Sequence, residues 1–76
     1  MLVIQLPKSE PIDLSEEQAD RLYDALWANT ATRGSVTAAA RLKAALTYMH
    51  RHGPPLEFEA EEASAVLAAL AASGLR

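Results

Sequence analysis

One pattern of sixteen residues occurs twice in this chain, and this repeat constrains the fold more than any other feature. Residues 11–26 read PIDLSEEQADRLYDAL and residues 55–70 read PLEFEAEEASAVLAAL, so equivalent positions lie 44 residues apart without a gap. When the two copies are aligned, apolar residues of one copy match apolar residues of the other at almost every apolar position. The sequence therefore predicts the same structural unit twice.

Each copy reads as a short strand followed at once by a helix. A proline opens an extended segment, and residues 12–14 and 56–58 then alternate apolar, acidic and apolar, as in a half-buried strand. In the first copy, Ser15 and Gln18 have the spacing of a capping box. Glu59 takes the place of Ser15 in the second copy and is a poorer cap, although acids suit the positive end of the helix dipole.

The two helices carry the same apolar stripe, which we expect to face the core. Their helical spacing predicts helices over residues 16–28 and 61–73, with Gly74 as the C-cap of the second. The stripe residues are Ala19, Leu22, Tyr23 and Leu26 in the first copy, and Ala63, Val66, Leu67 and Leu70 in the second.

The segments outside the repeat complete the element order. Residues 2–6 (LVIQL) form an apolar strand, which a polar connection with two prolines joins antiparallel to the strand at 11–14. Residues 29–35 form a loop. A further helix then begins near Ser35 or Val36 and ends before Gly53, with a core stripe of Ala39, Leu42, Leu46 and Met49 that Ala38 and Ala45 widen.

These elements predict one domain over residues 1–76, a small α+β two-layer fold of order β-β-α-α-β-α. Two consecutive helices return the chain to the end of the sheet from which it left, so the third strand runs antiparallel to the second. We therefore expect a mainly antiparallel three-stranded sheet with three helices on one face. If residues 2–6 lie at an edge, they can pair with the same strand of a second molecule.

Charge is segregated along the chain, and the basic part is the strongest indication of a partner. Residues 1–30 sum to −4, residues 31–54 to +4 and residues 55–76 to −3. A nucleic-acid interface would use the basic residues of the middle segment, Arg33, Arg41, Lys43 and Arg51. However, Arg41 and Lys43 lie far apart around a helix, and the whole chain is acidic. The favoured interpretation is that these cations face the carboxylates of the two flanking helices.

Catalytic and metal chemistry receive little support. His50 and His52 offer two metal ligands, but no third ligand is evident and the chain has no cysteine. The acids of the first helix occupy its first turn and its polar side, where solvated charge is ordinary. No nucleophile elbow or glycine-rich phosphate loop is present. We expect no enzyme activity, no cofactor and no metal.

Length and composition favour a cytoplasmic interaction protein. No apolar run approaches a membrane span, and the first residues lack the basic leader of a signal peptide. The alanine-, leucine- and glutamate-rich composition resembles that of small proteins from GC-rich bacteria and their phages. This resemblance in composition does not indicate a function.

The predicted function is a small non-catalytic protein-interaction module that forms a homodimer. One alternative is a nucleic-acid-binding regulator that uses the middle helix (residues 33–52), and another is a regulator of the antitoxin or anti-repressor type that binds one other protein. The interface candidates are the first strand, an aromatic pair one turn apart and the alanine face of the last helix: Leu2, Ile4, Tyr23, Trp27, Ala65, Ala68, Ala69 and Ala72.

Overall fold

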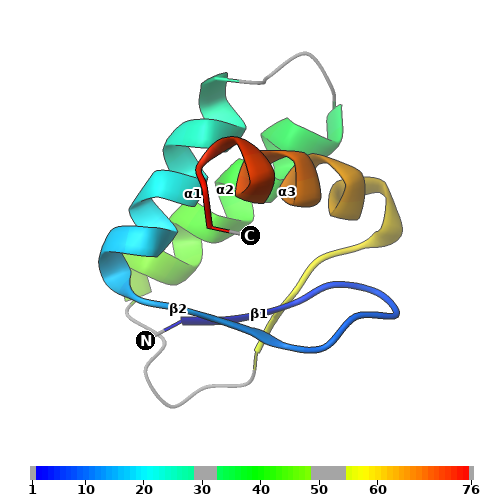
Figure 1. The fold of residues 1–76 in the computed structure, drawn as a ribbon, viewed down its shortest axis with the longest axis horizontal. Coiled ribbons are helices and arrows are strands. Elements are labelled where there is room, and N and C mark those ends of the chain that lie inside the picture. Colours follow the sequence, from blue (N-terminus) through cyan, green and yellow to red (C-terminus); the bar gives the residue numbers. More distant parts are fainter. Residues whose placement is uncertain (1, 29–32, 49–54, 76) are drawn as a thin grey trace.

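The chain folds into two layers, with three helices packed on one face of a small sheet (Figure 1). The computed structural model describes residues 2–28, 33–48 and 55–75. The elements are β1 (Leu2–Gln5), β2 (Ile12–Leu14), α1 (Glu16–Ala28), α2 (Arg33–Tyr48), β3 (Leu56–Glu57) and α3 (Ala60–Ala72). The predicted α+β class and the order β-β-α-α-β-α are confirmed.

The sheet is mixed, which corrects the prediction of a mainly antiparallel one. Its strand order is β2-β1-β3. β1 pairs antiparallel with β2, where Val3 lies opposite Asp13, and parallel with β3, where Ile4 lies opposite Leu56. β3 does run antiparallel to β2, as predicted. β3 pairs, however, with β1 and not with β2. Because β1 also runs antiparallel to β2, β1 and β3 run in the same direction and their pairing is parallel.

The central position of β1 also removes one predicted route to self-association. The edges of the sheet are β2 and β3, which are three and two residues long and follow Pro11 and Pro55. Short edge strands that begin at proline resist pairing with other chains. Leu2 and Ile4, proposed above as interface residues, are buried in the core. Neither side chain is available to a partner.

The repeat is realised in the structure at the same offset. α1 and α3 have 13 residues each and begin at equivalent positions. Side chains that match between the copies are buried in both, namely Leu14 and Phe58, Leu22 and Val66, and Leu26 and Leu70. The predicted capping box of α1 is confirmed, since the Ser15 N–H donates to Gln18 Oε1 at 2.9 Å and the Gln18 N–H donates to Ser15 Oγ at 3.2 Å.

α2 begins at Arg33, two or three residues before the predicted start near Ser35 or Val36. Gly34 looks like a loop residue, but it lies buried inside the first turn of the helix. A Cβ atom there would lie 2.3 Å from the carbonyl oxygen of Glu61. The glycine therefore marks a point where the backbones of α2 and α3 approach closely. Of the predicted core stripe, Ala38, Ala39, Leu42 and Ala45 are buried and Leu46 is partly buried, whereas Met49 and the predicted cap Gly53 lie outside the described residues.

α3 ends in a Schellman motif that needs a left-handed residue. Gly74 has φ +73°, its N–H donates to the Ala71 carbonyl at 3.2 Å, and the Leu75 N–H donates to the Leu70 carbonyl at 3.0 Å. The prediction of Gly74 at the end of the third helix is confirmed, although the helix spans Ala60–Ala72, one residue earlier than expected at each end.

We expect Gly74→Ala to lower the free energy of unfolding by about 1 kcal/mol, because an alanine with positive φ is strained. A Cβ atom at this position meets no atom within 4 Å, so the backbone conformation is the whole cause. Urea denaturation measures the change. Gly74→Asn is the matched control and should lose less, since asparagine tolerates this region better. Equal stability of Gly74→Ala and the wild type would contradict the assignment.

Candidate interaction surface and polar site

Beyond its first turn, the outward side of α3 is an uncharged surface turned to solvent. No charged residue occurs between Ala63 and Leu75. Leu67 is 46% exposed, and small exposed residues surround it at helical spacing. We call this set the α3 face, and it consists of Ser64, Leu67, Ala68, Ala71 and Ala72. A helix whose outer side lacks charge is unusual for a surface helix.

The repeat shows how far the α3 face departs from its counterpart. Position by position, Ser64 corresponds to Asp20, Ala68 to Asp24 and Ala71 to Trp27. Both acids of α1 are exposed, as expected for a solvated helix. The core positions of the two helices have kept their character, whereas the outer positions have not. The α3 face therefore lacks the charges that the equivalent positions of α1 carry.

The predicted alanine face is only partly this surface. Ala68 and Ala72 are exposed. Ala69 belongs to the core, with 1% exposure, and Ala65 is half-buried and packs against the core. The predicted alanine face was therefore rotated around the helix axis relative to the exposed side. Alanine occurs on every side of α3, so the presence of alanine alone does not show which side faces solvent.

The predicted aromatic pair is present on α1. The rings of Tyr23 and Trp27 meet edge to face, with centroids 6.1 Å apart and planes at 78°. Tyr23 is half-buried, and Trp27 is 50% exposed. The Nζ atom of Lys43 from α2 lies 5.4 Å from the centroid of the Tyr23 ring, which places it within cation–π range.

The cations of α2 do not form one basic stripe. Lys43 lies at the tyrosine ring on the α1 side. Arg41 lies on the α3 side, where its Nη1 atom is 2.9 Å from Glu62 Oε1. Arg33 lines the same region as Arg41, and Arg51 is outside the described residues. The expectation that basic residues face carboxylates of a flanking helix is thus fulfilled at Arg41.

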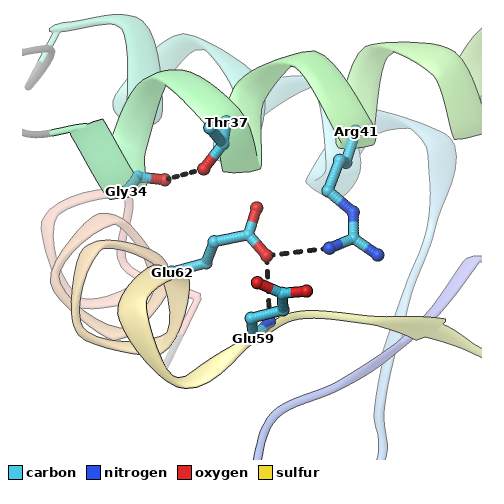
Figure 2. Close-up of polar contacts among 5 residues, drawn as sticks. All are labelled: Gly34, Thr37, Arg41, Glu59 and Glu62. Carbon is cyan, nitrogen blue, oxygen red and sulfur yellow. Dashed lines mark hydrogen bonds and ion pairs between the residues drawn. The ribbon is translucent and has the colours of Figure 1, made fainter.

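Beside this ion pair lies a polar depression of about 310 Å³ between α2 and the start of α3. Its lining residues are Arg33, Thr37, Arg41, Glu59, Glu61 and Glu62. Figure 2 shows how Glu62 reaches back across the start of α3 toward α2. Its Oε1 atom accepts from Arg41 and, at 2.9 Å, from the backbone N–H of Glu59. The Glu62 side chain is 3% exposed, whereas that of Arg41 is 41% exposed.

The second oxygen of Glu62, Oε2, receives no hydrogen bond from the residues that the structure describes. This oxygen is also buried. The Thr37 hydroxyl, which is drawn in Figure 2, donates instead to the Gly34 carbonyl at 3.2 Å. A buried carboxylate oxygen without a donor is costly and calls for a specific explanation.

The repeat sharpens this observation, because Glu62 is the equivalent of Gln18. Each side chain accepts a hydrogen bond from the N–H of the N-cap residue just before its helix, at 2.9 Å in both copies. Gln18 does so as a neutral and exposed amide, whereas Glu62 does so as a buried acid. Capping therefore does not require the charge. Sequence reasoning placed Glu62 among ordinary first-turn acids, and the mismatch with Gln18 was the signal that could have singled it out.

Other kinds of site are not evident in the part of the chain that the structure describes. No three His, Cys, Asp or Glu side chains there lie close enough to hold a metal ion. His50 and His52 fall outside those residues. No helix within them is long and apolar enough to cross a membrane.

No known protein family, curated protein or solved structure shows significant similarity to this chain.

Proposed function

We propose that the chain is a small non-catalytic interaction module that self-associates through the α3 face. The observation that carries this proposal is the absence of charge on that face, in contrast to the matched positions of α1, Asp20 and Asp24. Exposed apolar surface that interrupts an otherwise charged exterior is typical of protein contacts. Leu67 supplies a central apolar side chain, and the small residues around it allow close approach of another helix.

We propose a second copy of the chain as the partner of this face. The net charge of −3 makes two molecules repel each other, and a contact made through uncharged residues keeps like charges apart. A partner selected by electrostatic complementarity would instead need charges here. Two α3 faces that pack across a two-fold axis place each Leu67 against the small residues of the other copy, which is an isologous contact.

The exposed Trp27 on α1 is a further candidate contact, but its neighbours Asp20 and Asp24 are charged. The nucleic-acid alternative has less support, because Arg41 and Lys43 already have partners within the chain. Binding of one other protein, as in an antitoxin, would draw on the same apolar surface. The two proposals differ in their partner, so a measurement of self-association distinguishes our proposal from binding of one other protein.

We expect Ala68→Glu to weaken self-association at least about a hundredfold, because each copy would bury an unpaired carboxylate in the contact. Sedimentation velocity over a range of concentrations measures the change, and the wild type should form dimers at roughly tens of micromolar. Stability of the monomer should hardly change, since position 68 is exposed.

Ala44→Glu is the matched control, because Ala44 is an exposed alanine on α2 that lies outside the α3 face. This variant should associate like the wild type. A strictly monomeric wild type at these concentrations would contradict the proposal and favour a foreign partner. Equal weakening by both substitutions would show that net charge, and not the α3 face, controls association.

A further inference from the structure

The outer side of α1 combines an exposed aromatic ring with exposed acids. Trp27 is 50% exposed, and Asp20 and Asp24 are exposed as well. Spacings of four and three residues place all three side chains on one side of the helix, away from its buried residues. We call Asp20, Asp24 and Trp27 the α1 stripe. It shares no residue with the α3 face or with the polar depression, so it is a separate surface.

The two acids of the α1 stripe have no ionic partner among the residues that the structure describes. The ion pairs found there join Arg21 to Glu17 and Arg41 to Glu62. Two carboxylates one helical turn apart repel each other when no cation lies between them. A cation from another molecule would remove this repulsion.

The aromatic pair beside these acids already binds one cation of its own chain. Lys43 Nζ lies 5.4 Å from the centroid of the Tyr23 ring, and that ring meets Trp27 edge to face. Tryptophan attracts cations more strongly than tyrosine does. No cation from the described part of the chain lies over the Trp27 ring, which therefore offers its exposed surface to a cation from outside.

The repeat shows that the fold does not require this combination of residues. The matched positions of α3 are Ser64, Ala68 and Ala71, and α3 is a helix of the same length. Solvation of an outer surface accounts for acids on α1 but not for a tryptophan, because alanine serves at the matched position. Exposed tryptophan beside charged residues is typical of the centre of a protein contact.

We propose that the α1 stripe binds a basic, arginine-containing segment of another protein. One arginine stacks on Trp27 and pairs with Asp24, and a second basic residue one turn away pairs with Asp20. The guanidinium is planar, so it can stack on an indole ring and donate to a carboxylate at the same time. Residues 1–30 sum to −4, and this charge attracts such a segment.

A second copy of the chain fits the α1 stripe less well than a foreign basic segment. Its Arg41 and Lys43 already have partners within their own chain, and two copies with net charge −3 repel each other. The α1 stripe and the α3 face therefore call for different partners, one basic and one uncharged.

The test is a titration of the full chain with a capped alanine-based peptide that carries arginines four and three residues apart, as in the α1 stripe. Trp27 is the single tryptophan of the chain, so its fluorescence reports binding at the stripe. We expect a saturable change that weakens with added salt. The same peptide with lysines has equal charge and should bind at least about threefold more weakly. Equal affinities, or no saturable change, would overturn the proposal.

Variants are compared by the fluorescence anisotropy of a labelled arginine peptide. Asp24→Asn should weaken binding about fivefold and Trp27→Ala about tenfold. Both variants should fold, since the replaced side chains are exposed and alanine occupies the matched position 71 of α3. Glu57→Gln changes the net charge as Asp24→Asn does, but on β3, and should bind like the wild type. Equal weakening by Asp24→Asn and Glu57→Gln would overturn the proposal, because net charge alone would explain it.

Sedimentation of Trp27→Ala without peptide separates a foreign partner from a second copy. This variant should self-associate like the wild type, because Trp27 lies outside the α3 face. Weaker self-association would place a second copy on the α1 stripe and overturn the proposal. The peptide titration does not depend on self-association, so failure of the α3 contact and failure of the α1 stripe give different results.

Discussion

Gly34→Ala is expected to lower the free energy of unfolding by about 2–3 kcal/mol, because it forces two helix backbones apart. The added Cβ atom would lie 2.3 Å from the Glu61 carbonyl oxygen and 3.2 Å from the carbonyl carbon. Neither atom belongs to a flexible side chain, so α3 itself must move. Alanine is the better helix former by up to about 1 kcal/mol, and that gain is too small to offset the clash.

Urea denaturation measures the change, with the dependence of the unfolding free energy on urea concentration fitted to one common slope for all variants. Val36→Ala is the control, since Val36 lies in the same turn but is 43% exposed. It should alter stability by less than about 0.5 kcal/mol. An alanine at position 34 that left the midpoint unchanged, or raised it, would refute the close approach of α2 and α3 at this residue.

Arg41→Ala is expected to cost about 2 kcal/mol, because it leaves the buried carboxylate of Glu62 without its cation. Removal of one partner from a fully buried ion pair costs about 3–5 kcal/mol. The expected loss is smaller here because the Arg41 side chain is 41% exposed, which allows water to reach part of the space that it vacates.

A double-mutant cycle separates this cause from the loss of arginine packing. Glu62→Gln alone should cost less than about 1 kcal/mol, because the amide oxygen still accepts the Glu59 N–H. In a Glu62→Gln background, Arg41→Ala should then cost little, since no buried charge remains. Additive effects of the two substitutions would show that the ion pair contributes nothing specific to stability.

The two helices of the repeat were predictable to within one residue. The capping box at Ser15 indicated the start of α1, whereas α3 begins at Ala60, one residue before its predicted start. At α2 the prediction began late, because Gly34 reads as a loop residue in isolation. Its helical position depends on the carbonyl of Glu61, which contacts it only after the chain has folded.

Strand order was not predictable, because alternation of polar and apolar residues defines which side of a strand is buried and not which strand is its neighbour. For the same reason the sequence identified Leu2 and Ile4 as apolar but not as central. The site at Glu62 was missed for a related cause. Its burial comes from α2 crossing over the start of α3, whereas its sequence neighbours Glu59 and Glu61 are exposed.

The central position of β1 has a consequence for the order of folding. This strand lies outside both copies of the repeat, yet it joins their strands into one sheet. Its hairpin with β2 is a local contact that can form early. Its pairing with β3 joins Ile4 to Leu56 across most of the chain, so the entropy of closing a long loop must be overcome first. The sheet is therefore completed only when the second copy docks, and we expect the two copies to fold as one cooperative unit.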